Sequence, residues 1–180
     1  MSISAHKVFG PKGIGALLLR SRNYEKPPLE PLMIGGGQER GLRPGTLAVP
    51  LIAGFGKAAE LSMRDHLERK NKCIEFRDKA LEAISSIGGV LNGDKENTLC
   101  HTLNVSIPGV NSEAAMIVLK DIVYISNGSA CTSSDYQLSH VLKSMDLPDS
   151  RIEEAIRISW CHMTDKVDWD LFKSKLSSIR

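Results

Sequence analysis

Apolar side chains recur at helical spacing between Thr46 and Ile87. The positions are Leu51, Ile52, Phe55, Ala59, Met63, Ile74, Leu81 and Ile84. This period predicts a single long helix. Thr46 is a good N-cap residue, and the Gly88-Gly89 pair supplies a stop. We therefore expect a helix over residues 46–87, long enough to bridge two lobes.

The chain before this helix reads as turns and short apolar runs. Residues 13–19 (GIGALLL) predict a turn that leads into a buried strand. Residues 21–45 hold four prolines and a run of three glycines, which predicts a loop.

The chain after the helix has an α+β rhythm. We expect strands near 90–92, 98–107, 123–126 and 155–160, and helices near 112–121, 138–145 and 164–179, with Ser112 and Thr164 as caps. The expected fold class is α/β, with a small α+β lobe after the long helix. We place one domain over residues 1–65 and a second over residues 66–180.

Composition excludes several classes of protein. The 180 residues are 42% hydrophobic with a formal net charge of +2, and the basic residues are spread along the chain. A nucleic-acid-binding surface would concentrate them, so no direct nucleic-acid binding is expected. No apolar run approaches the roughly 20 residues of a membrane span. The four cysteines follow no framework spacing, and no export signal precedes them, which indicates free thiols in the cytoplasm.

The first candidate for chemistry is Lys7, within residues 4–16 (SAHKVFGPKGIGA). A lysine can bind a carbonyl cofactor covalently when the cofactor is held beside it. Most lysines are simply solvated surface residues. The glycine-rich sequel favours the first interpretation, because it forces a tight turn directly after the lysine.

The second candidate is residues 35–46 (GGGQERGLRPGT). Glycines, two arginines and a threonine at a helix N-terminus are suited to binding an anion. A plain surface loop with a capping threonine explains the same residues equally well.

The third candidate is Cys131, near the centre of a run of small residues over 126–134. Such residues cannot pack a core, so we expect a mobile loop that presents the thiol. A reactive thiol must be accessible and reacts as the thiolate. The alternative is an incidental cysteine in a loop.

In this order, the three segments resemble the signature of group I cysteine desulfurases, which belong to the class V aminotransferase superfamily and have the fold-type I architecture. The resemblance extends to residues 91–94 (LNGD) and 103–106 (LNVS). It implies pyridoxal 5'-phosphate as the cofactor and L-cysteine as the substrate. The products would be L-alanine and a cysteine persulfide that passes to an acceptor protein.

The resemblance also implies a role for each matching residue. Lys7 would bind the cofactor covalently and later move a proton, and Cys131 would attack the substrate sulfur. Ser4 and His6 would hold the cofactor phosphate, and Thr46 would reach the phosphate of the neighbouring subunit in a homodimer. Arg157 would bind the substrate carboxylate.

The chain departs from this family pattern in two ways. It opens a few residues before the lysine, so we expect a fragment that needs a complementing N-terminal half and lacks desulfurase activity alone. Residues 160–164 (WCHMT) replace a common Gly-Arg pair, and Asn127 replaces a common serine. These variants are similar to the desulfurases of DNA phosphorothioate modification. The pathway could equally be iron–sulfur cluster assembly or tRNA thiolation.

Two alternatives stay open beside the desulfurase. One is a sulfur-carrier or scaffold module that presents Cys131 without cofactor chemistry, and the other is a relative of selenocysteine lyase. The pairs Cys100-His101 and Cys161-His162 would together supply a Cys₂His₂ set of ligands, which suits zinc. We expect no metal, because neighbouring strand residues point to opposite faces of a sheet and the spacing matches no zinc finger.

Overall fold

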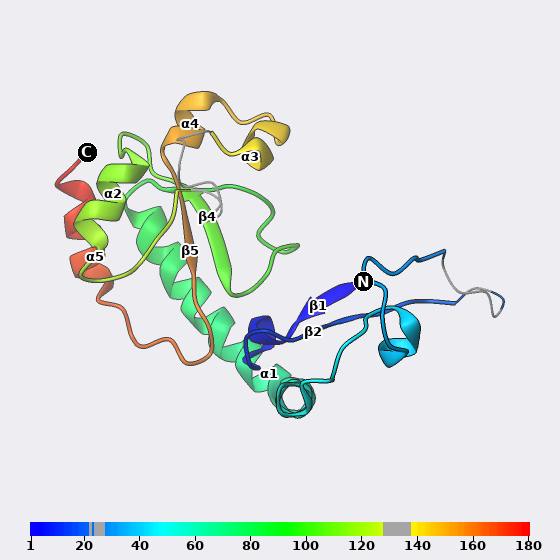
Figure 1. The fold of residues 1–180 in the computed structure, drawn as a ribbon. Helices are drawn as coiled ribbons and strands as arrows, with labels where there is room; N and C mark the ends of the chain where they lie inside the picture. The colour runs from blue at the N-terminus through cyan, green and yellow to red at the C-terminus, as the bar shows by residue number, and fades with distance from the viewer. Residues whose placement is uncertain (22, 24–27, 128–137) are drawn as a thin grey trace. The chain divides into compact units, whose positions relative to one another are not determined.

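The structure is a computed structural model that describes residues 1–21, 23, 28–127 and 138–180. The chain divides into two compact units, Met1–His66 and Leu67–Arg180. Helix α1 (Val49–Ser86) begins in the first unit and ends in the second (Figure 1). The predicted mixed α/β fold with one long helix is confirmed.

Within its described residues, the first unit holds a short β-hairpin and two 3-10 helices. Strand β1 (Ser2–Ser4) pairs antiparallel with β2 (Gly15–Leu17), with Ser4 opposite Gly15. The first 3-10 helix, η1 (Ala5–Val8), follows β1 directly. The second, η2 (Gln38–Gly41), lies in the glycine-rich loop before α1.

The second unit is built on an antiparallel sheet in the order β3-β4-β5. The strands are β3 (Val90–Leu91), β4 (Thr102–Ser106) and β5 (Ala155–Ser159). The helices are α2 (Ser112–Leu119), α3 (His140–Ser144), α4 (Asp149–Glu153) and α5 (Trp169–Ser177).

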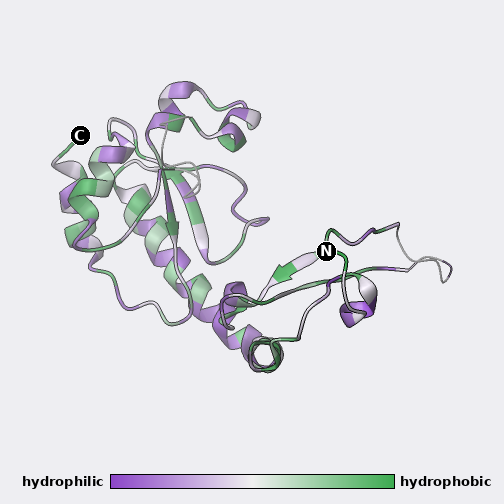
Figure 2. Cartoon of the chain, viewed as in Figure 1, coloured by the Kyte–Doolittle hydropathy of each residue, from purple (hydrophilic) through white to green (hydrophobic). Residues whose placement is uncertain are grey.

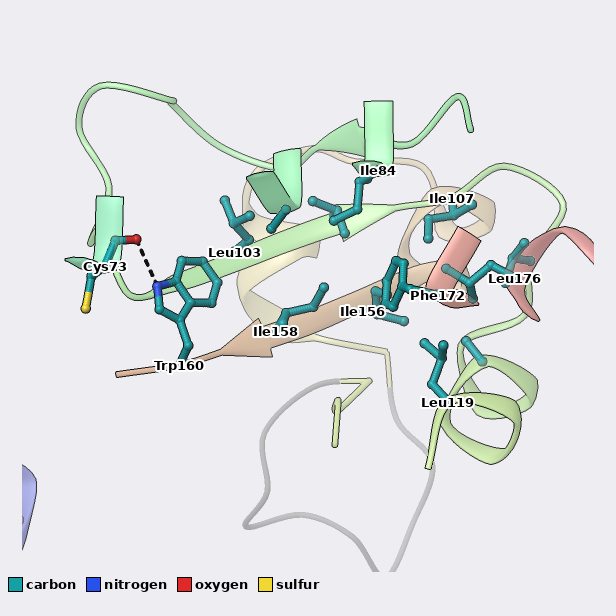
Figure 3. Packing of buried hydrophobic residues seen from close by; sticks show 14 residues of the cluster. Cys73, Ile84, Leu103, Ile107, Leu119, Ile156, Ile158, Trp160, Phe172 and Leu176 are labelled. Carbon is teal, nitrogen blue, oxygen red and sulfur yellow. Dashed lines mark hydrogen bonds between the residues drawn. The ribbon is translucent and has the colours of Figure 1, made fainter. Parts of the chain in front are cut away.

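The core of the second unit lies on one face of this sheet. Cross-strand pairing places Leu103 opposite Ile158 and Val105 opposite Ile156, so their side chains share that face. Residues of α1, α2 and α5, such as the fully buried Phe172, pack with them (Figure 3). In the hydropathy view, hydrophobic and hydrophilic residues are interleaved along α1, as expected for a helix with one buried side (Figure 2).

Several expected boundaries were wrong. Helix α1 starts at Val49, three residues after Thr46, and its first turn is closed by the carbonyl of Ala48. Asn111, not Ser112, caps α2, and its carboxamide accepts from Glu113 N at 3.0 Å. Asp168 caps α5, so this helix begins well after Thr164.

The expected strand near 123–126 was also wrong. A single bridge joins Ser126 to Arg157, and residues 120–123 instead turn back on the end of α2 through Val123 N, which donates to Leu119 O at 2.9 Å. The short helix α4 was not predicted, because its five residues carry too few apolar positions to show a period.

Candidate active site

Lys7 lies in a turn whose backbone is closed on both sides. Ala5 N donates to Ile14 O at 3.1 Å, and Gly10 N donates to Ala5 O at 2.9 Å. Phe9 ends η1 in the left-handed conformation, at φ 64°. Lys7 therefore sits between two hydrogen bonds that fix the path of its main chain.

Close packing against α1 holds this turn in place. Ala5 is fully buried, and a Cβ added to Gly10 would lie 3.0 Å from Ala5 O and 3.1 Å from Ala58 Cβ. Both distances are tighter than most real Cβ contacts allow, so glycine lets the turn approach the helix. The Lys7 side chain is exposed, and its amine has no hydrogen-bond or ion-pair partner within the described residues.

The residues expected to hold the phosphate lie in the same unit. Ser4 is half-buried at the end of β1, and His6 is exposed in η1. Thr46 is exposed in the loop ahead of α1, so it is not the helix cap that the sequence predicted.

The glycine-rich loop has an irregular backbone. Glu39 and Arg40 are left-handed, at φ 50° and 60°, inside η2. Gly45 N donates to Gln38 Oε1 at 3.1 Å, and Arg43 Nη1 donates to Pro44 O at 2.7 Å. These contacts fold the loop on itself, and its expected role in anion binding stays a prediction.

Arg157 lies in β5, in the second unit. It is opposite Asn104 of β4 on one side, and on the other it exchanges two backbone hydrogen bonds with Ser126, of 2.6 and 3.0 Å. Its side chain belongs to the sheet face opposite the core and is half-buried.

A polar network on the same sheet face was missed by sequence reasoning. The buried Asn92 carboxamide donates to Asn104 Oδ1 at 2.8 Å and to Ser106 Oγ at 2.7 Å. Arg151 Nε donates to Asn92 Oδ1 at 2.8 Å, and Ser106 Oγ donates to Arg151 O at 2.7 Å. The LNGD and LNVS motifs contain three of these residues, yet only the strand register shows that they meet.

Cys131 lies outside the described residues. Cys73, Cys100 and Cys161 are free thiols. Burial, first of all, raises the pKa of the Cys73 thiol, and the neighbouring Cys100 and Cys161 add to this effect. No group of three or more histidine, cysteine or acidic residues within the described ranges could hold a metal ion.

The predicted residues therefore fall into two groups. Ser4, His6, Lys7 and Thr46 belong to the first unit, and Arg157 belongs to the second. Their roles in binding a ligand and their joint arrangement stay predictions.

The family model described as aminotransferase class-V matches residues 1–172. The chain belongs to this family. It is 41% identical to a cysteine desulfurase IscS from Rickettsia bellii, over 99% of this chain and 44% of the relative. The chain thus spans less than half the length of the curated relatives that it matches.

Solved structures of this family have the same fold. A NifS-like protein superposes with a TM-score of 0.79 at 32% identity, over 99% of this chain and 45% of that protein. DndA from Streptomyces lividans superposes with a TM-score of 0.72 at 39% identity, over 89% of this chain and 46% of DndA. No helix in the described part of the chain is long and apolar enough to cross a membrane.

Proposed function

We propose that these 180 residues form part of a cysteine desulfurase that uses pyridoxal 5'-phosphate. The reaction removes the sulfur of L-cysteine, releases L-alanine and leaves a persulfide on Cys131. The observation that carries the proposal is Lys7, an exposed amine on a turn that is fixed from both sides. Support comes from the cysteine desulfurase relatives, whose aligned residues are about 40% identical to this chain.

The residues of the first unit fit the cofactor. An amine with no partner in the described part of the chain is available for covalent attachment, and a fixed main chain limits where it can reach. Ser4, His6 and Thr46 would hold the phosphate, with Thr46 acting across a homodimer. The chemistry that the bound cofactor would supply is an electron sink for the substrate α-carbon. Lys7 would hold the proton that moves to and from that carbon.

Arg157 and Cys131 would act on the substrate. A guanidinium binds a carboxylate through two parallel hydrogen bonds, and the strand pairing on both sides of Arg157 fixes its backbone. Cys131 would attack the substrate sulfur as a thiolate and deliver it to an acceptor protein.

Further parts of the proposal come from the family. Residues 1–65 would belong to the large cofactor-binding domain and residues 66–180 to the small domain with the cysteine loop. The enzyme would be a cytoplasmic homodimer, completed by the remaining family polypeptide. A role in DNA phosphorothioation is one candidate pathway, raised by the variants at Asn127 and residues 160–164. Identity does not separate the pathways, because DndA is 39% identical to this chain and the IscS relatives are 40–44% identical.

Borohydride trapping tests the assignment of Lys7. The chain is incubated with pyridoxal phosphate, reduced, and its modified peptides are identified by mass spectrometry. We expect modification at Lys7 in preference to Lys12, an exposed lysine of the same segment that serves as the control. Equal trapping at both lysines would contradict the assignment, and Lys7→Ala should abolish the preferred product.

A second experiment separates the desulfurase from a sulfur carrier. The chain is assembled with the preceding segment of a desulfurase relative, and visible absorbance and alanine release are followed. Cys131→Ser should keep the cofactor absorbance and block persulfide formation, whereas Lys7→Ala should remove both. A protein that accepts sulfur with no cofactor absorbance would instead be a carrier.

A further inference from the structure

A groove of about 620 Å³ lies within the second unit, a volume typical of small-molecule sites. One wall is α1, and the other is the segment that leads into β4. The lining residues are Lys70, Ile74 and Arg77 from the helix and Lys95, Glu96, Thr98, Leu99 and Cys100 from the segment. None of these residues belongs to the candidate active site.

The groove carries an excess of positive charge. The ammonium groups of Lys70 and Lys95 have no carboxylate partner within the described residues, and Glu96 is the single acid of the described lining. Arg77 Nε is buried 3.5 Å from Asp78 Oδ1 without making a hydrogen bond. Asp78 offsets the charge of Arg77. The remaining charges of the lining are the two ammonium groups of Lys70 and Lys95 and the carboxylate of Glu96, and this net positive charge favours an anionic ligand.

The same groove presents a thiol. The backbone pairing of β4 with β5 continues past the strand ends, because Trp160 N donates to His101 O at 3.0 Å. The Trp160 indole donates to Cys73 O at 3.0 Å and ties this corner to α1 (Figure 3). Cys73 is buried there and Cys100 is half-buried, so Cys100 is the thiol that a ligand in the groove would meet.

We propose that this groove is a thiolation site at which Cys100 reacts with small disulfides that carry carboxylates. Lys70 and Lys95 attract the carboxylates, and Ile74 with Leu99 contacts the carbon skeleton. This inference is independent of the desulfurase function.

The reaction is thiol–disulfide exchange. The Cys100 thiolate attacks one sulfur of the ligand, and a new S–S bond forms as the ligand S–S bond breaks. The departing thiolate takes up a proton from water. Cys100 is oxidised, the departing half of the ligand is reduced, and the disulfide is the only oxidant required.

Two reagents of opposite character test the proposal on the full chain. The first is dithiobis(nitrobenzoate), a dianionic disulfide, and the second is dipyridyl disulfide, which is neutral. The rate of modification at Cys100 is measured for each by timed quenching and peptide mass spectrometry. Peptide mapping separates Cys100 from the other three thiols, and Cys100→Ser should remove only the Cys100 product.

The expected result is a change in the ratio of the two rates. An interaction between unit charges about 4 Å apart in water corresponds to about fivefold in rate. Lys95→Gln and Lys70→Gln should therefore each lower the anionic-to-neutral ratio by up to about fivefold. Lys143→Gln, an exposed lysine of α3 outside the groove, should leave it unchanged.

Salt supplies a second measurement that needs no variant. Raising the ionic strength to about 1 M shortens the Debye length to about 3 Å, so the wild-type ratio should fall towards that of the lysine variants. The proposal is overturned if Cys100 is not modified, if Lys143→Gln lowers the ratio as much as the groove variants, or if the neutral rate falls with the anionic one.

Discussion

Replacing Asn92 by alanine should destabilise the second unit. Asn92 is 8% exposed, and its carboxamide makes three hydrogen bonds, to Asn104, Ser106 and Arg151. They join β3 to β4 and both strands to α4. Alanine would remove all three hydrogen bonds and leave the polar groups of Asn104, Ser106 and Arg151 partly buried without this partner.

The magnitude follows from those contacts. A hydrogen bond contributes about 1 kcal/mol net, and somewhat more when one partner is charged. Arg151 keeps its bond to Leu91 O at 3.0 Å, and Asn104 is half-buried and can reach water, which limits the loss. We therefore expect Asn92→Ala to lower the free energy of unfolding by about 3 kcal/mol.

Urea unfolding followed by tryptophan fluorescence measures this loss. Both tryptophans, Trp160 and Trp169, pack in or against the core of the second unit, so the signal reports on that unit. Asn71→Ala, on the exposed side of α1, is the matched control and should change stability by less than about 0.5 kcal/mol.

The variant Asn92→Asp tests the directions of the hydrogen bonds. An aspartate keeps the acceptor for Arg151 but turns an oxygen towards Asn104 Oδ1, so its stability should lie between alanine and wild type. A loss below about 1 kcal/mol for Asn92→Ala, with an unchanged denaturant slope, would show that the network contributes little.

Four further predictions concern the first unit and the thiols. Gly15→Ala would place a Cβ 2.5 Å from Ile3 O, so it should disrupt the β1–β2 pair and reduce cofactor trapping in the adjacent turn. Gly56→Ala, on α1 with open space around its Cα, should instead stabilise the helix by about 0.5–1 kcal/mol in thermal unfolding. The folded-state pKa of Cys73 is raised above its unfolded value, so its contribution to stability is present below the unfolded pKa and is lost as pH rises through the folded pKa. Unfolding measured from neutral to alkaline pH should show this decline, and Cys73→Ala should weaken it. Cys131 should be labelled fastest by the neutral reagent iodoacetamide, as peptide mapping would show.

Local sequence patterns predicted which helices and strands exist better than they predicted where each one begins and ends. The apolar period over 46–87 identified α1, because a long amphipathic helix repeats its signal many times. Capping depends on one side chain and one backbone conformation, so Asn111 and Ser112 are both reasonable candidates until the φ/ψ values distinguish them. The strand near 123–126 was wrongly predicted because its apolar residues suggested a strand. Val123 and Ile125 do pack against the core, but they do so from a turn.

The candidate site divides in the same way. The glycines after Lys7 predicted a tight turn, and the structure shows one closed against α1. The network around Asn92 joins residues 12 to 59 positions apart, and no local pattern marks such pairs. Thr46 was taken for a helix cap because its side chain is a good capping group. Pro50 was the better signal in the sequence, since proline favours the first turn of a helix and α1 begins at Val49.

Two different constraints fix the candidate residues, and they predict different sensitivities to mutation. The turn of Lys7 depends on close backbone approach at Gly10, where an added methyl group would lie 3.0 Å from Ala5 O and 3.1 Å from Ala58 Cβ, so these neighbours would have to shift by a few tenths of an ångström. Arg157 depends instead on backbone pairing with β4 and Ser126, which most side chains leave intact. Substitution of Gly10, which carries no functional group, should therefore disturb the lysine turn. Around Arg157, substitutions on its own sheet face should leave the strand pairing intact, whereas the flanking Ile156 and Ile158 are buried in the core and should tolerate little change. The main-chain position of Lys7 thus depends on packing, and that of Arg157 depends on strand register.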